Sequence, residues 1–314
     1  MPPSLTRLDI ETKAYNFSGH ASFPLRFAWL TKGCKRICEN PAAFRADDRL
    51  VKFGVGNNMV EAIAHWGISC QVWSYAKDTK YYSMTDLGQR LLAQDGWDHY
   101  LEKFGTYWLL HWNLVTNQRK ATMWELIFNR SSTAFTLESI TAEAIAECEK
   151  QTIRAPSKAT LKRDFLTFAK SYLIETSKKK GLIEDEFDCP FKHLGLISGG
   201  AEKGELMLNY GAKPTLPSSI FEYALLQFAS SEGKQLLSLN HILGALNSPG
   251  KVFCLDEMST MEYLNELSRR DPECYQFDDT NGLRQFVIRN NSEKSNFFNV
   301  LASYYCDPNS QENG

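Results

Sequence analysis

Hydrophobic positions in residues 41–92 change from helical spacing to short apolar runs. Asp47 to Phe53 predicts a short helix, and Gly54-Val55-Gly56 predicts a tight turn after it. A second helix is predicted from Asn57, because apolar side chains then recur every three or four residues. The apolar stretch Ile68 to Trp73, a polar turn and a short return predict a β-hairpin. Two helices, a turn and a hairpin are the order of a winged-helix module.

The same order of helices and strands recurs twice further along the chain. The segments predicted next are helices at 124–128, at 137–148 and from 158, and strands within 194–210. The last part predicts helices at 220–228, 238–246 and 259–267, a firm turn at 247–250, and strands at 273–277 and 283–288. We therefore expect a mainly α fold with small β-hairpins (α+β), built from tandem winged-helix-like modules. The expected boundaries are 1–120, 121–215 and 216–314, with an acidic third module.

Composition and charge narrow the class of protein. Hydrophobic residues make up 43% and charged residues 23% of the 314 residues, which is the balance of a globular chain. Residues 1–180 carry 25 Lys and Arg against 18 Asp and Glu, whereas residues 181–314 carry 10 against 19. The net charge is thus +7 for residues 1–180 and −9 for residues 181–314, which fits an N-terminal half that binds nucleic acid. Solvated faces that merely differ in sign explain the same numbers equally well.

Cysteine usage and hydropathy predict a cytoplasmic protein. No apolar run reaches the roughly 20 residues that a bilayer span needs, and the first residues lack a secretory apolar core. Eight scattered cysteines are then expected to be reduced thiols. Cys34 and Cys38 have the spacing of half a zinc site, but no second close pair of ligands follows.

Several short segments together resemble a bacterial family of unknown function found beside DNA phosphorothioation and phage-defence genes. The segments are Gly19–Arg26, Trp29–Gly33, Gly54–Val60, Gly105–Trp112, Thr160–Asp164, Asp188–Phe191, Gly211–Pro217, Ser248–Phe253 and Thr280–Gln285. They span roughly residues 17–305, nearly the whole chain. None is a catalytic signature alone, and their order carries the resemblance. One departure is His99, at a position where we expect Pro in relatives.

The resemblance implies DNA binding and the possibility of strand nicking, because one family member is credited with nicking DNA. It also implies partners: double-stranded DNA and the other proteins of a phosphorothioation-based defence system. Nicking would call for Mg²⁺ or Mn²⁺ held by carboxylates. A homodimer is left open, and no membrane partner is expected.

Candidates for chemistry are few. Asp95, Asp98 and Glu102 would share a face if their stretch were helical, although Gly96 and Trp97 favour a turn there. His20 is a candidate acid or base beside two cations, Arg26 and Lys32, that are candidates for phosphate contact. The alternative is that His20 is a buried hydrogen-bonding residue and that the two cations hold the backbone. His111, within an aromatic run, is assigned to the core.

Candidates for DNA contact lie at the starts of two predicted helices. Asn57 and Asn58 are suited to contacting adenine, or alternatively cap their helix. Lys158, Lys162 and Arg163 follow the predicted N-cap Ser157 and are candidates for groove or phosphate contact, or alternatively an ordinary solvated face. Three hypotheses follow: a DNA nickase, a non-catalytic DNA-binding adaptor that recruits partner enzymes, and a transcriptional regulator.

Overall fold

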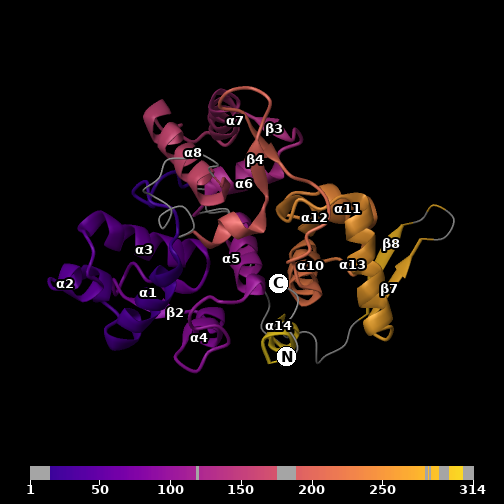
Figure 1. The fold of residues 1–314 in the computed structure, drawn as a ribbon, viewed down its shortest axis with the longest axis horizontal. Coiled ribbons are helices and arrows are strands. Elements are labelled where there is room, and N and C mark those ends of the chain that lie inside the picture. Colours follow the sequence, from indigo (N-terminus) through magenta and orange to yellow (C-terminus); the bar gives the residue numbers. More distant parts are fainter. Residues whose placement is uncertain are drawn as a thin grey trace.

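The computed structural model describes residues 15–117, 120–174, 189–279, 282, 284–289 and 297–306. Within them the chain is mainly helical, with three small antiparallel sheets. The expected fold class, mainly α with small hairpins, is confirmed. No helix in these ranges has the length and apolar character that crossing a membrane requires. Figure 1 shows the first part of the chain at the left, the second at the top and the third at the right, with helix α5 between them.

The first part contains the two predicted helices and the predicted hairpin. Its elements are α1 (Phe27–Glu39), the 3-10 helix η1 (Ala43–Arg45), α2 (Arg49–Phe53), α3 (Asn57–Ser69), β1 (Trp73–Tyr75), β2 (Tyr82–Met84) and α4 (Asp86–Leu92). The sequence pattern missed α1. It also placed the strand too early, because α3 continues through Gly67 and ends at Ser69. Gly67 does not break the helix, because it makes room for the Trp73 ring, which would lie 1.9 Å from a Cβ at this position.

Helix α5 (Phe104–Thr116) is the centre of the fold. Every residue from Gly105 to Val115 is buried, so the helix is enclosed on all sides. His111, fully buried as expected, joins two other parts of the chain. The Tyr172 hydroxyl lies 2.8 Å from its Nδ1, and its Nε2 lies 2.8 Å from the Val252 carbonyl. A buried imidazole that satisfies both nitrogens in this way is a structural cross-link.

The second and third parts share a connectivity. The second has α6 (Thr122–Asn129), β3 (Ala134–Phe135), α7 (Leu137–Lys150), α8 (Lys158–Tyr172), the 3-10 helix η2 (Pro190–Leu194), β4 (Ile197–Gly199) and β5 (Leu206–Leu208). The third has α10 (Ser218–Glu232), β6 (Leu236–Ser238), α11 (Leu239–Gly244), α12 (Pro249–Val252), α13 (Glu257–Arg270), β7 (Tyr275–Asp278) and β8 (Gln285–Ile288). Their strand orders are β3-β5-β4 and β6-β8-β7, so each last strand pairs between the other two. The turn predicted at 247–250 lies at residues 246–247, where Asn247 is left-handed. Ser248 then caps α12, which already contains Pro249 and Gly250.

One hydrophobic core runs through all three parts. Asn129 and Asn247 form a reciprocal pair of hydrogen bonds between the second and third parts, at 2.6 and 2.8 Å. Helix α14 (Phe297–Cys306), the last in the described residues, returns to pack against α10 and against the start of α5. The three module boundaries remain a prediction.

Candidate functional site

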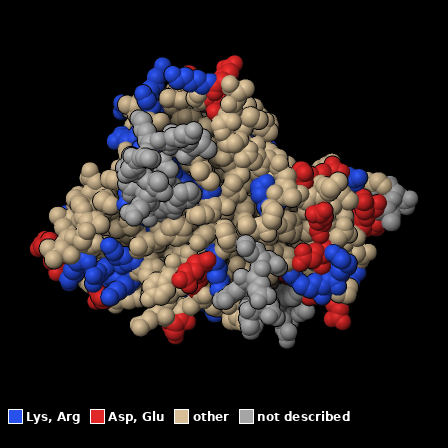
Figure 2. All heavy atoms as spheres, in the orientation of Figure 1, with Lys and Arg blue, Asp and Glu red and all other residues tan. Residues whose placement is uncertain are grey.

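Helix α8 presents a basic outer face. Ser157 caps its first turn by accepting a hydrogen bond from the Thr160 amide at 3.2 Å, as its sequence position predicted. The stripe predicted to face the core is buried, and consists of Leu161, Phe165, Phe168 and Tyr172. The charged side chains that point outward are all cationic, and they are Lys158, Lys162, Arg163 and Lys170; Ala159 and Leu166 are exposed between them. Figure 2 shows Lys and Arg side chains gathered at the upper left, where α8 lies in Figure 1.

The only carboxylate on α8 points inward. Asp164 is 1% exposed, and its Oδ1 lies 3.1 Å from Nε2 of His20, while its Oδ2 accepts the Ser18 amide at 2.8 Å. Nδ1 of His20 accepts the Ser22 amide at 3.1 Å, so the ring proton is on Nε2 and faces Asp164. With both nitrogens occupied and 1% exposure, His20 has no atom available to a substrate. The geometry assigns it the structural alternative rather than acid–base catalysis.

The loop that carries His20 is backbone-strained and tightly packed. Ser18, Ala21 and Ser22 all have positive φ, which non-glycine residues rarely adopt. The His20 ring stacks on Trp66 at a centroid distance of 6.2 Å. Burial, with His20 nearby, lowers the pKa of His65 to about 3, so this surrounding disfavours positive charge. The loop therefore fixes α8, and with it the basic face, to the first part of the chain.

The start of α3 differs from the predicted cap. Gly56 occupies the N-cap position, and Asn57 is the first helical residue. The side-chain Oδ1 of Asn57 accepts a hydrogen bond from the Arg49 guanidinium at 2.9 Å, and its Nδ2 donates to Glu61 at 2.9 Å. Neither asparagine caps the helix through its side chain. Asn57 is held in a polar chain, whereas Asn58 is exposed at the same helix end.

The two cations near His20 in the sequence contact the protein itself. Arg26 is the N-cap residue of α1, and its guanidinium carbon lies 5.8 Å from the centroid of the Trp29 ring. The Lys32 ammonium donates to the Phe53 carbonyl, at the end of α2, at 3.1 Å. Both are partly buried. The Lys32 contact matches the alternative in which this side chain holds the backbone, whereas the Arg26 contact is with an aromatic ring of its own helix.

The acidic trio lies in a turn and does not assemble around a common point. Asp95 is exposed, and Asp98 is buried with both oxygens committed. Asp98 accepts from the amides of Glu102 and Lys103, at 2.8 and 3.0 Å, and from the Thr106 hydroxyl at 2.6 Å. Within the described residues no group of three or more His, Cys, Asp and Glu side chains is placed to hold a metal ion. Asp98 orders the start of α5, and the trio does not fit a Mg²⁺ site.

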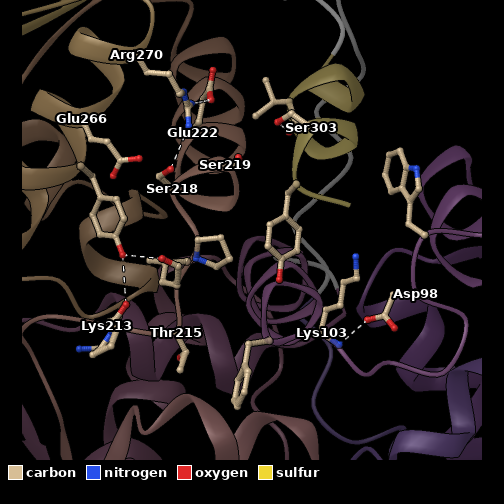
Figure 3. Close-up of a pocket in the computed structure, with 18 of the residues that line it drawn as sticks. Asp98, Lys103, Lys213, Thr215, Ser218, Ser219, Glu222, Glu266, Arg270 and Ser303 are labelled. Carbon is tan, nitrogen blue, oxygen red and sulfur yellow. Dashed lines mark hydrogen bonds and ion pairs between the residues drawn. The ribbon is translucent and has the colours of Figure 1, made fainter. Parts of the chain in front are cut away.

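A large cleft opens beside this turn, and the sequence did not point to it. It has a volume of about 1530 Å³ and lies between residues 97–104, the segment 212–219 that leads into α10, and the helices α13 and α14 (Figure 3). Glu262 and Glu266, four residues apart on α13, line it together with Glu102. That acidic i, i+4 spacing, and the resemblance segment Gly211–Pro217, were the available signals.

Comparison with known proteins places the chain in a family. Residues 17–305 match the family described as "Protein of unknown function (DUF4007)". The chain belongs to this family. No curated protein matches the sequence.

Two solved structures of SspB are similar to this chain. A magnesium ion-bound SspB crystal structure superposes with a TM-score of 0.84, and a second SspB crystal structure with 0.82. In both cases the sequences are 28% identical, and the match covers 95% of this chain and 92% of the other. The likeness therefore extends over all three parts of the DUF4007 fold and supports the expected resemblance.

Proposed function

We propose that this DUF4007 protein is the DNA-binding component of a phosphorothioation-based phage-defence system. The similarity to SspB supports a protein related to phosphorothioation defence. The observation that carries DNA binding is the face of α8, where Lys158, Lys162 and Arg163 are exposed and no carboxylate points outward. Such a face neutralises phosphates, and each contact releases counterions from DNA.

The place of α8 in the chain supports the same proposal. Among the α-helices of the described residues it is the last before the hairpin β4–β5, with the 3-10 helix η2 between them. This place in the order resembles that of the recognition helix in a winged-helix module. In that arrangement the start of the helix enters the major groove, and phosphate contacts fix its orientation. The basic residues lie mostly in the first two turns of α8, where this docking requires them.

Nicking of one strand is a second candidate, favoured by the similarity to a magnesium ion-bound SspB. The carboxylates first suggested, Asp95, Asp98 and Glu102, do not fit a Mg²⁺ or Mn²⁺ site. The geometry therefore supports the non-catalytic adaptor better, in which the protein holds DNA while other proteins of the system act on it. A transcriptional regulator would instead prefer one operator-like palindrome.

The test is incubation of the pure protein with supercoiled plasmid in Mg²⁺, Mn²⁺ or EDTA, with a mobility-shift assay on the same samples. We expect shifted, intact plasmid that the Lys158, Lys162 and Arg163 triple alanine variant no longer shifts at equal concentration. Open circles that form only with metal would establish the nickase. A wild-type protein that shifts no DNA at low salt would overturn the proposal.

A further inference from the structure

The C-terminal helix builds one wall of the cleft. The Tyr305 ring stacks on Trp97 with a centroid distance of 5.1 Å and an interplanar angle of 7°. Its hydroxyl lies 2.9 Å from the Thr106 hydroxyl, inside the core, and the Tyr304 hydroxyl accepts the Gly105 amide at 3.1 Å. Helix α14 is thus anchored to the start of α5. The cleft between α14 and α13 is a fixed feature of the packed chain (Figure 3).

The cations that line the cleft are engaged by the protein. Lys213 is buried, and its ammonium donates to the carbonyls of Asn209, Gly211 and Cys254 at 2.9 to 3.0 Å. Burial accordingly lowers its pKa. Arg270 forms an ion pair with the buried Glu222. An ammonium with all three donors satisfied is not free to bind an anion.

The third cation is engaged less completely. Lys103 donates to the Tyr305 carbonyl at 3.1 Å, and its ammonium lies 5.5 Å from the centroid of that ring. Together, these contacts leave the cleft with little available positive charge.

The carboxylates of the cleft are available. Five Asp or Glu residues line it against three Lys or Arg. Of the five, Asp98 and Glu222 are buried and bonded within the protein. Glu102, Glu262 and Glu266 form no ion pair within the part of the chain that the structure describes, and Glu102 and Glu262 are exposed. The surface that a ligand meets is therefore negative.

Aromatic rings accompany these carboxylates. Tyr100 is 69% exposed at the cleft, and Phe104, Tyr263 and Tyr304 also line it. Aromatic faces attract ammonium and guanidinium groups, and carboxylates pair with them. DNA is disfavoured here because its phosphates would meet unpaired carboxylates.

We propose that this cleft binds a segment of a partner protein that carries Lys or Arg side chains. The inference goes beyond DNA binding and does not depend on it, since the cleft and the outer face of α8 share no residue. It gives the acidic third part of the chain a role: to receive a basic segment of another protein while α8 faces away from it.

The experiment is selection of a phage-displayed library of random 12-residue peptides on the full-length chain. Selected peptides are then titrated by fluorescence anisotropy. We expect enrichment of Lys and Arg and binding about tenfold weaker in the triple variant Glu102→Gln, Glu262→Gln, Glu266→Gln. The matched control neutralises three exposed carboxylates outside the cleft, Asp78→Asn, Glu138→Gln and Glu149→Gln, and should bind within about twofold of the wild type.

A photo-crosslinker at Tyr100 locates what occupies the cleft. With p-benzoylphenylalanine at this position, a selected peptide should crosslink to the wild-type chain and less to the triple glutamine variant. No enrichment of Lys or Arg, equal binding by both triple variants, or crosslinking of a DNA duplex at Tyr100 would overturn the proposal. A crosslink from Tyr100 to the chain's own residues 175–188, or to a second copy, would overturn it as well. Equal melting temperatures of the variants exclude misfolding as the cause.

Discussion

Helices α8 and α13 occupy equivalent places in two parts of the molecule that share a connectivity, yet their outer faces are opposite in charge. Within the described residues each is the last α-helix before a hairpin, although the 3-10 helix η2 also lies between α8 and its hairpin. Each hairpin joins an earlier strand in a three-stranded sheet of the same order. The outer face of α8 is cationic. The outer face of α13 carries Glu257, Met258 and Glu262 near its start, and its cations lie in the last turn. Figure 2 shows Asp and Glu more numerous on the right of the molecule, where the third part lies.

The comparison shows that the buried positions of the two helices have one role and the exposed positions another. Both helices bury leucines against a common core, and this is enough to fix their place. The exposed positions contribute little to stability and are free to set the partner. We infer that α8 faces DNA, whereas α13 contributes to a protein-binding cleft.

The largest effect is expected from the shared scaffold. Leu161 on α8 and Leu264 on α13 are both fully buried. Leu161→Ala and Leu264→Ala should each lower the free energy of unfolding by about 3 kcal/mol, because each leaves a cavity. Urea denaturation followed by circular dichroism measures both. If only one substitution lowers the free energy of unfolding, the packing of α8 and that of α13 do not contribute equally to the stability of the fold.

The second prediction concerns the surfaces. Replacing Lys158, Lys162 and Arg163 with Glu should weaken DNA binding by about fiftyfold and lower the salt slope by about one per lost phosphate contact. The matched reversal on α13, Glu257→Lys with Glu262→Lys, should change DNA affinity less than about threefold. Anisotropy titrations at several salt concentrations measure both. An unchanged salt slope in the folded α8 variant would exclude this face from DNA contact.

The sequence predicted the secondary-structure elements better than the tertiary contacts between them. The stripe Leu161, Phe165, Phe168 and Tyr172 was readable because helical spacing is local. Helix α1 was missed although its buried residues have helical spacing, because Gly33 and Cys34 stand in the middle of that face and make it less apolar. The cleft was not predictable, because it joins residues near 100 to residues near 215, 262 and 303 through long-range packing.

The site residues show the same limit of local patterns. His20 beside two cations in the sequence suggested chemistry, whereas the fold turns His20 toward Asp164, 144 residues away. Asp98 suggested a metal ligand, whereas its oxygens are bonded to amides four and five residues ahead. A partner 144 residues away leaves no periodic pattern to detect, and backbone amides as the partners of Asp98 leave no side-chain pattern.

The third prediction tests the junction between the two compared parts. His111 contacts Tyr172 at the end of α8 and the Val252 carbonyl of α12, and burial lowers its pKa from 6.5 to about 4. As the pH falls, His111 is therefore protonated in the unfolded chain at a higher pH than in the folded protein. The stability from neutral His111 is complete above pH 6.5 and is lost as the pH falls toward about 4.

The measurement is the free energy of unfolding at pH 7 and pH 5. The neutral His111 contributes about 2 kcal/mol to the drop between them. Since His65 has a lowered pKa of the same sign, the wild type loses stability from both residues. His111→Gln keeps a donor and an acceptor but does not titrate, so its drop should be about 2 kcal/mol smaller. An equal drop in both proteins would mean that His111 is not the acid-sensitive junction.

The smallest effect is expected at α3, whose start is neither strongly basic nor acidic. Asn58 is exposed, whereas Asn57 is held between Arg49 and Glu61. If α3 contacts bases, Asn58→Ala should change the preferred sequence in a randomised duplex pool while overall affinity changes by less than about threefold, because phosphate contacts dominate affinity. Asn57→Ala is the matched control and should leave the preference unchanged. A preference that neither substitution alters would confine DNA recognition to α8 and leave the first part of the chain as its support, since the His20 loop already fixes that helix in place.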